Sequence, residues 1–148
     1  MKKWLKKFSI LIIPIFCFSC IPIYLNNKKT EKLTQEMLNA PLPNKTELIE
    51  LFSGCGNTSG TGDHVEIWIG LLVKSELSKR ELLEFYRNSY KYIEVYEVTT
   101  KTELEYCYFI MDRLGISFEN LKNVSHDDGY FIVGRTESPA SSFDIRGM

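Results

Sequence analysis

Histidine is scarce in this sequence, and the residue pairs that metal sites and covalent catalysts need are missing. Its 148 residues include two histidines, His64 and His126, and four cysteines. Beyond residue 20, none of these stands at a Cys-x-x-Cys or His-x-x-x-His spacing, so the sequence predicts no metal site. A Gly-x-Ser-x-Gly elbow is also absent, because the glycines near Ser59 are Gly56 and Gly60. We therefore assign no catalytic residue and no cofactor from sequence motifs.

The sequence also lacks an excess of positive charge. Lysine and arginine number 18 against 19 acidic residues, which gives a net charge of -1. Four of the lysines precede Cys20, and the rest of the chain carries 14 basic and 19 acidic residues, a net charge of -5. Nucleic acid is not an expected partner, because its binding needs clustered Lys and Arg. The aromatic (13%) and charged (25%) contents are ordinary for a folded globular protein.

One long apolar run is present, near the N-terminus. Residues 2–7 contain four lysines and no acid, and residues 8–18 are apolar apart from one serine. A positive stretch followed by an apolar core of about 7 to 15 residues is typical of a secretory signal, because the lysines stay on the cytoplasmic side while the core inserts. We predict that residues 1–20 are an export signal and that the rest of the chain lies outside the cytoplasmic membrane.

Ser19 and Cys20 leave three outcomes open for this signal. A small residue before a cysteine suits a bacterial lipoprotein signal, in which Cys20 is lipidated and becomes the new N-terminus. We favour this outcome, although Cys17 and Phe18 depart from the usual lipobox. Ordinary signal cleavage is the second outcome. The third is an uncleaved transmembrane anchor, because residues 8–25 are long enough to span a bilayer. The membrane is then a partner through lipid chains or through a helix.

Residues 21–44 predict a tether between the signal and a folded domain. The segment from Asn26 to Glu36 is polar and rich in lysine, and we expect a short helix over residues 30–39. Pro41 and Pro43 stiffen the chain that follows. We therefore expect one small domain over residues 45–148, with room for a modest single core.

Patterns in residues 45–148 predict an α+β domain. Apolar residues alternate from Val65 to Val73, which predicts a central strand with the Val65 face buried. Ser78 and Glu81 form a capping-box pattern ahead of an apolar helical face. Residues 102–114 fit a helical face but also have the aromatic and β-branched character of a strand, and we favour the helix.

The expected fold class is a small single α+β domain with a three- to four-stranded, mainly antiparallel sheet and a helix packed on one face of a strand-helix-strand core. The expected elements are a short helix over 46–52, a glycine-rich loop over 54–63, strands over 64–75, 92–99 and 130–136, helices over 79–89 and 102–114, a turn at 127–129 and a loose tail over 138–148.

Cys55 and Cys107 are the two cysteines of the expected domain. In an exported protein such a pair can form a disulfide, and closing a loop of about fifty residues adds on the order of 4 kcal/mol in the chain-entropy model. The alternative is two separate buried thiols, since a disulfide needs Cα atoms about 4.4 to 6.8 Å apart. A third interpretation makes Cys55 a nucleophile with His64 as its base, although no further residue completes the set.

The glycine-rich loop is the other candidate site. Its residues Gly56, Asn57, Thr58, Ser59 and Gly60 can contact a ligand or a partner, because functional contacts favour loops. Phosphate is a disfavoured ligand: the loop lacks a Gly-Lys-Ser/Thr ending and precedes a strand, whereas nucleotide-binding loops follow one. A flexible crossing between two elements is the plainer interpretation.

Three segments of the chain carry a resemblance to other proteins. They are residues 55–63, 72–78 and 143–147, which read CGNTSGTGD, LVKSELS and FDIRG. Through them the chain from residue 54 to 147 resembles a group of small uncharacterised bacterial lipoproteins. The resemblance implies export and a similar fold, and the group brings no known activity.

These observations favour a membrane-tethered extracytoplasmic domain that binds a protein or a small ligand, because the signal is clear and no catalytic set is complete. Two alternatives stay open. One is a cell-envelope hydrolase that uses Cys55 and His64. The other is an immunity or inhibitor protein, which would be encoded beside a toxin or protease gene.

Overall fold

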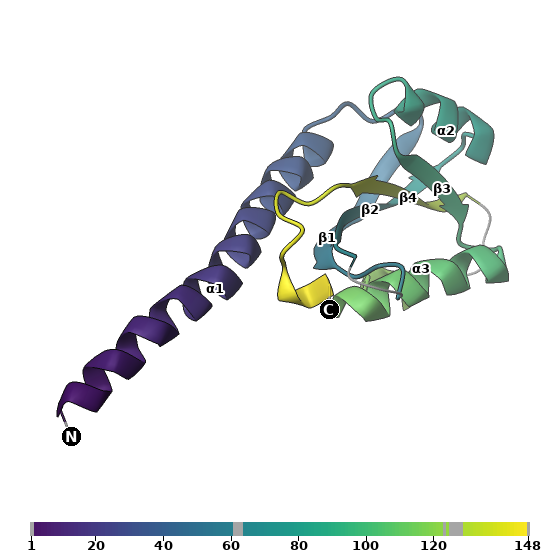
Figure 1. Ribbon diagram of the computed structural model, residues 1–148. Coiled ribbons are helices and arrows are strands. Elements are labelled where there is room, and N and C mark those ends of the chain that lie inside the picture. Colours follow the sequence, from purple (N-terminus) through teal and green to yellow (C-terminus); the bar gives the residue numbers. More distant parts are fainter. Residues whose placement is uncertain (1, 61–63, 123, 125–128, 148) are drawn as a thin grey trace.

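Four antiparallel strands form a single sheet in the order β1-β2-β4-β3 (Figure 1). The computed structural model describes residues 2–60, 64–122, 124 and 129–147, and at residues 2–19, 122 and 147 it describes the backbone alone. The strands are β1 (Thr46–Gly56), β2 (Glu66–Ser75), β3 (Ile93–Glu97) and β4 (Tyr130–Glu137); the helices are α1 (Lys2–Leu38), α2 (Lys79–Arg87) and α3 (Lys101–Leu114), with short 3-10 helices η1 (Asn120–Lys122) and η2 (Ile145–Gly147).

Strand β2 lies between β1 and β4, and its side chains are buried on both faces of the sheet. Every residue from Ile67 to Val73 is buried. The strand was predicted correctly, but only its Val65 face was expected to be covered. Trp68 and Leu72, on the other face, are buried beneath α3. Gly70 makes room for the tryptophan ring, because a Cβ there would lie 2.6 Å from a ring carbon of Trp68.

Residues 46–52 belong to strand β1, so the predicted short helix is wrong. The strand pairs with β2 in antiparallel register along its whole length, from Thr46 opposite Ser75 to Gly56 opposite Glu66. A bulge between Leu48 and Glu50 shifts this register. The bulge interrupts the period-2 alternation that identifies a strand, which explains why the apolar residues looked helical. Gly54 and Gly56 are likewise strand residues, not part of the expected loop.

Helix α2 connects β2 to β3, and β4 lies between these two strands. The helix and its capping box were predicted correctly. The backbone N–H of Ser78 donates to the Glu81 carboxylate at 2.8 Å, and the Ser78 hydroxyl accepts the backbone N–H of Glu81. These bonds satisfy donors that the first turn of a helix leaves open. Leu82 and Tyr86 then point into the core.

Helix α3 covers residues 101–114, which confirms the helical interpretation of this segment. Gly115 ends it with a positive φ of 66°, a backbone conformation that glycine adopts without strain. The strands expected over 92–99 and 130–136 are present as β3 and β4. Of the turn predicted at 127–129, residues 127 and 128 lie outside the described residues, as does His126.

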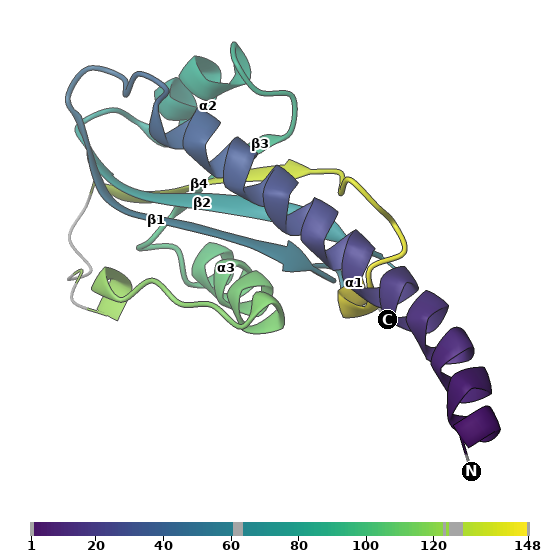
Figure 2. The same ribbon diagram turned by 90° about the vertical axis from the view of Figure 1, so that its left-hand side faces the viewer.

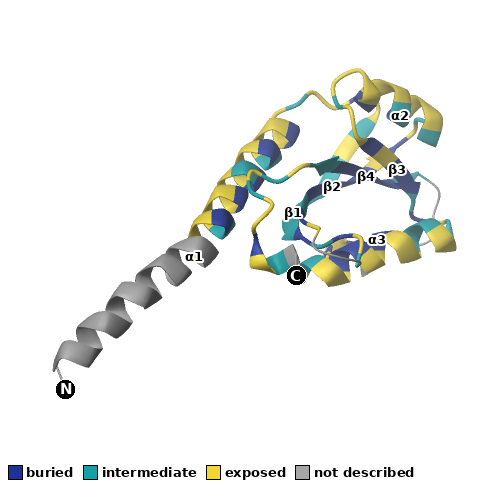
Figure 3. Cartoon of the chain, in the orientation of Figure 1, coloured by how far each residue is buried: buried dark blue, intermediate teal, exposed yellow. Residues whose placement is uncertain are grey.

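The sheet separates two apolar clusters (Figures 2 and 3). The first cluster lies under α1 and α2, and the second lies under α3. The predicted class, a small α+β domain with a mainly antiparallel sheet, is therefore confirmed. The structure adds a second helical layer, since helices cover both faces where the prediction placed one on a single face.

Helix α1 corrects the expectation of a tether over residues 21–44. The helix does not stop at the expected 30–39 but extends from Lys2 to Leu38. Its C-terminal half lies across the sheet (Figure 2), with Leu33 and Met37 in the first cluster and Asn26 fully buried. Buried side chains recur three or four residues apart, at Pro22, Asn26, Thr30, Leu33 and Met37, which is the spacing of one helical face. The packed unit therefore begins near residue 22 instead of residue 45.

Candidate functional site: a groove along the free edge of strand β1

Strand β1 is an edge strand, because β2 pairs with only one of its sides. An edge strand directs half of its backbone N–H and C=O groups away from the sheet. Among the described residues, no hydrogen bond from another segment reaches the outer backbone groups of Ser53, Gly54 or Cys55. A groove of about 500 Å³ runs along these three residues.

One wall of the groove is the polar face of α1. Thr30, Thr34 and Gln35 line it. The hydroxyls of Thr30 and Thr34 each donate to the carbonyl four residues earlier in the helix, at 2.9 and 2.7 Å. These hydroxyl oxygens can still accept a hydrogen bond from a group in the groove. The wall thus combines neutral polar groups with the exposed side chain of Gln35.

The opposite wall comes from the end of α3. Leu114 and Ile116 lie there. Leu114 packs directly onto the strand, because a Cβ at Gly54 would lie 3.2 Å from the Cβ of Leu114, and one at Gly56 would lie 3.1 Å from its side chain. The two glycines therefore permit a close helix-strand contact. This is a different role from the flexible loop that their spacing predicted.

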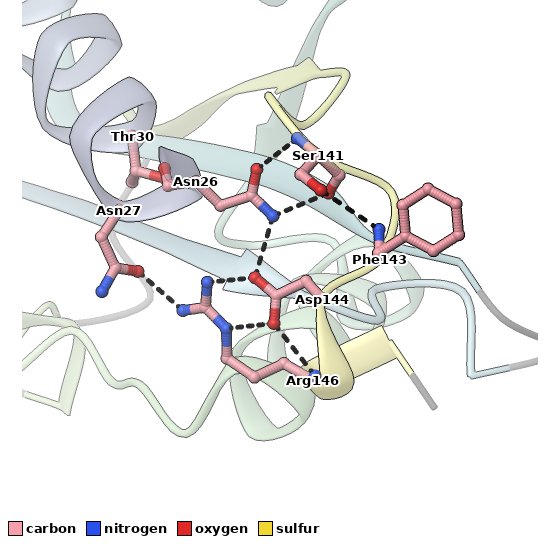
Figure 4. Close-up of polar contacts among 7 residues, drawn as sticks. All are labelled: Asn26, Asn27, Thr30, Ser141, Phe143, Asp144 and Arg146. Atoms are coloured by element: carbon pink, nitrogen blue, oxygen red, sulfur yellow. Dashed lines mark hydrogen bonds and ion pairs between the residues drawn. The ribbon is translucent and has the colours of Figure 1, made fainter. Parts of the chain in front are cut away.

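Arg146 of the C-terminal tail lines the groove, and Figure 4 shows the polar contacts that hold this tail against α1. The side-chain amide of Asn26 donates to the Ser141 carbonyl at 2.9 Å, and its oxygen accepts the Ser141 N–H at 2.8 Å. The same amide donates to the Asp144 carboxylate at 2.8 Å. Arg146 donates to Asp144 through Nε at 2.9 Å and to Asn27 through Nη1 at 2.8 Å. The tail expected to be loose is instead pinned to α1.

Asp144 is a buried carboxylate, with 1% of its surface exposed. Its burial acts to raise its pKa, but the hydrogen bonds from Arg146 and Asn26 outweigh this effect and hold the pKa below the usual value. The hydrogen bond to Asp144 in turn raises the pKa of Arg146. The ion pair is therefore fully charged at neutral pH and fixes the guanidinium at the end of the groove.

Cys55 lines the groove and packs partly buried against the first cluster. Burial raises the pKa of this thiol, and the opposing effects of Arg146 and of the Thr30 hydroxyl do not cancel that rise. The thiol is therefore less ionised at neutral pH than a free cysteine, which makes it a poor nucleophile.

Cys55 and Cys107 are free thiols in the structure, and the disulfide that the sequence left open does not join them there. Cys55 pairs with Ile67 and packs against the first cluster, whereas Cys107 is fully buried in the second. The sheet lies between them. The two thiols thus match the alternative interpretation of separate buried or partly buried cysteines, and burial raises the pKa of Cys107 to about 12.

His64 does not join Cys55 as a base. Its Nε2 lies 2.9 Å from Oε1 of Glu66. Glu66 precedes Ile67 on β2, so its side chain points to the opposite face from Ile67 and its partner Cys55. The geometry therefore gives no support to a Cys55–His64 pair.

The predicted binding loop is structured by its own side chains. The Asn57 carboxamide oxygen accepts the N–H of Gly60 at 2.8 Å and the hydroxyl of Ser59 at 3.2 Å. The buried Thr58 hydroxyl donates to Glu66. Gly60 has a φ of 74° and leaves room for the side chains of α3, since a Cβ there would lie 2.7 Å from Nη2 of Arg113. Residues 61–63 lie outside the described part of this loop.

Cys20 is exposed on α1, six residues before the buried Asn26. Its lipidation remains a prediction, and the side chains of residues 2–19, on which the export signal depends, lie outside the described residues. Across the part of the chain that the structure describes, no helix combines the length and the apolar character needed to cross a membrane.

A larger hollow, of about 930 Å³, lies at the other end of the sheet. Two of its charged groups are paired: Nζ of Lys45 lies 2.8 Å from a Glu76 oxygen, and both side chains are well exposed. Both hollows touch β1, the larger one at Thr46 and Glu47, but of the two only the groove along Ser53, Gly54 and Cys55 is lined by residues of α1 and α3, which makes it the stronger candidate. No cluster of three metal-ligating side chains occurs among the described residues.

No protein-family model, curated protein or solved structure matches this chain. The site is therefore defined by its geometry. Sequence reasoning identified Cys55 but missed the other residues that shape the groove, among them Thr30, Leu114 and Arg146. A signal for one of them was present, since residues 143–147 carried part of the resemblance to small lipoproteins and contain Asp144 and Arg146.

Proposed function

We propose that this protein is an exported, membrane-anchored domain that binds an extended segment of another polypeptide along the free edge of β1. The observation that carries the proposal is the groove itself, which exposes Ser53, Gly54 and Cys55 of an edge strand between the walls formed by α1 and α3. A peptide that enters as a fifth strand would satisfy the outer backbone groups of β1.

The groove favours a polypeptide over a charged small ligand. Among the described residues that line it, Arg146 is the one basic residue, and it already bonds Asp144 and Asn27. The remaining lining is made of neutral polar side chains on α1 and of apolar ones at the end of α3, apart from Glu31. Main-chain hydrogen bonds would supply affinity, and alternate side chains of the peptide would face the two walls. An immunity or inhibitor protein would be a special case, in which the bound segment belongs to a toxin or protease.

The proposed anchor is Cys20, lipidated after cleavage of the export signal. Cys20 lies six residues before Asn26 on one continuous helix, a rise of about 9 Å. The anchored domain would thus stand directly on the membrane instead of on a flexible stalk. Mass spectrometry of the mature N-terminus tests the anchor: an acylated Cys20 is the expected result, and an unmodified N-terminus beyond residue 20 would contradict it.

A peptide selected from a library of extended sequences tests the binding mode. We expect N-methylation of the peptide backbone to weaken binding at every second residue, because only alternate N–H groups face the partner strand. On the protein, Gln35→Trp should obstruct the groove and weaken binding, whereas Lys32→Trp, on an exposed α1 position outside the groove lining, should not. Binding that tolerates every N-methyl group, or that ignores Gln35→Trp, would overturn the proposal.

A further inference from the structure

Large apolar side chains are exposed where α1 meets the C-terminal tail. Ile21, Tyr24 and Leu25 on the helix are 53%, 60% and 44% exposed, and Phe143 and Ile145 on the tail are 72% and 49% exposed. Single exposed apolar residues are common on protein surfaces, but a group of five large ones from two segments marks an interaction surface. We call these five residues the apolar end of the domain.

Hydrogen bonds on both sides of Phe143 fix the tail so that this residue faces outward. The backbone of Ser141 accepts one hydrogen bond from the Asn26 side chain and donates another to it. The buried Asp144 carboxylate accepts a hydrogen bond from the same side chain. The segment between these two fixed points carries Phe143, whose ring projects away from the polar contacts (Figure 4). The exposed ring therefore belongs to an ordered segment and not to a free chain end.

Both parts of the apolar end lie at the same end of the molecule. Asn26 directly follows Leu25 on α1 and contacts Ser141 and Asp144 on the tail. Figures 1 and 2 both show the tail beside α1, past the end of the sheet where β1 and β4 finish.

We infer that the apolar end is embedded in the interfacial layer of the membrane and fixes the orientation of the domain on it. The inference rests on the proposed anchor, because Cys20 directly precedes Ile21. Acyl chains on Cys20 would bring residues 21–25 to the depth of the lipid headgroups, about 9 Å of helix before Asn26. An uncleaved N-terminal helix would place the same residues at the same depth.

The side chains of the apolar end suit a lipid interface. Nζ of Lys28 lies 5.8 Å from the centre of the Tyr24 ring. An aromatic ring beside a lysine is the combination found at membrane surfaces, where the ring sits among headgroups and the ammonium reaches the anionic phosphates. With this end in the lipid, the groove along β1 would open beside the membrane, where it could receive a segment of an envelope protein.

Quenching of tryptophan fluorescence by brominated lipids tests the inference on the full chain, purified from membranes and placed in phosphatidylethanolamine–phosphatidylglycerol vesicles. Phe143→Trp places the reporter in the apolar end. Leu42→Trp is the matched control, since Leu42 is 37% exposed in the loop between α1 and β1, at the opposite end of the domain. The unsubstituted protein gives the background, which is Trp68 alone after cleavage before Cys20 and Trp4 together with Trp68 when the N-terminal helix stays uncleaved.

We expect brominated acyl chains to lower the emission of the tryptophan at position 143 by about half, and to leave the tryptophan at position 42 unchanged, because interfacial groups sit 5 to 10 Å below the headgroup boundary. Sedimentation with the vesicles separates the two proposals. Protein that sediments without quenching at position 143 keeps its anchor but overturns the embedded end, and would point to a protein partner for that surface. Protein that does not sediment overturns the anchor and the inference together.

Discussion

The two faces of the sheet are covered in different ways. On the first face, α1 and α2 bury a cluster that includes Leu71 and Tyr86. On the second face, α3 and the segment that follows it cover a cluster built around aromatic rings, in which Phe52 contacts Phe118 edge-on at 5.6 Å and stacks near Trp68 at 6.5 Å. The second face is covered by α3, which follows β3 closely in the sequence. The first face depends on α1, which precedes every strand of the sheet.

A buried arginine distinguishes the first face further. Arg135 is 6% exposed, its Nη2 lies 2.7 Å from a Glu137 oxygen, and its guanidinium stacks on the Tyr90 ring at 4.5 Å. Its Nη1 lies 3.7 Å from the Glu36 carboxylate of α1. Polar contacts therefore fasten α1 to the sheet at Arg135 and to the C-terminal tail at Asn26. Specific polar partners therefore fix the position of α1. A helix that forms one wall of the groove needs such fixed contacts.

Truncation of either of two neighbouring residues on β2 should have the largest effect on the free energy of unfolding, and each truncation tests a different face of the sheet. Leu71 points to the first cluster and Leu72 to the second, and both are at most 1% exposed. Replacing either by alanine should lower the free energy of unfolding by about 2 to 5 kcal/mol, because each leaves a cavity in a packed core. Chemical denaturation measures the loss.

Hydrogen exchange on the same variants then distinguishes the two layers. Leu71→Ala should speed exchange in α1 and α2, and Leu72→Ala should speed it in α3. Equal changes in all three helices for both variants would show that the two faces open together, and would remove the contrast between them.

Asp144→Asn should release the tail from α1. The substitution leaves the Arg146 guanidinium without its charged partner, at an expected cost of about 2 kcal/mol in the free energy of unfolding. The pKa of Asp144 is held below its unfolded value, so its stabilisation is complete above about pH 3.9 and is lost as the pH falls through the lower folded value. Denaturation at pH 7 and near pH 3 checks both points. A variant that loses as much stability at the low pH as at pH 7 would contradict the assignment.

The two thiols should differ in reactivity by about tenfold or more, which corresponds to about 1.4 kcal/mol. Cys55 is partly exposed in the groove, whereas Cys107 is fully buried beneath α3 and has its pKa raised to about 12. A thiol reagent followed by peptide mapping measures the two rates in one sample. A peptide bound along β1 should slow labelling of Cys55 and leave Cys107 unchanged, and equal rates at both positions would contradict the structure.

The elements that sequence patterns predicted correctly carry local signals. Strand β2 lies in a segment whose apolar residues alternate from Val65 to Val73, and α2 begins at a capping box that lies wholly within residues 78–81. Gly115 likewise marks the end of α3. In each case the residues that determine the element are neighbours in the sequence.

The elements that were missed depend on distant partners. Strand β1 contains a bulge and acquires its strand character from pairing with β2. The docking of α1 depends on Asn26, whose partner Asp144 lies 118 residues away. No local sequence pattern marks the groove, because its lining residues come from α1, α3 and the tail, which lie far apart in the sequence. Pairings of this kind are decided by tertiary packing, which a single sequence does not display.

The caps of the two helices give the smallest expected effect and a final contrast between the faces. Ser78 caps α2 on the first face, whereas Thr100 precedes α3 on the second without a side-chain bond to the helix, its hydroxyl donating instead to Glu97 at 3.2 Å. Ser78→Ala should lower the free energy of unfolding by about 1 kcal/mol, and Thr100→Ala by only a few tenths, because only the first removes a cap. Parallel denaturation curves measure the difference. Equal losses would mean that α3 also relies on its first residue, and that packing against the aromatic rings of the second cluster is not sufficient to hold it.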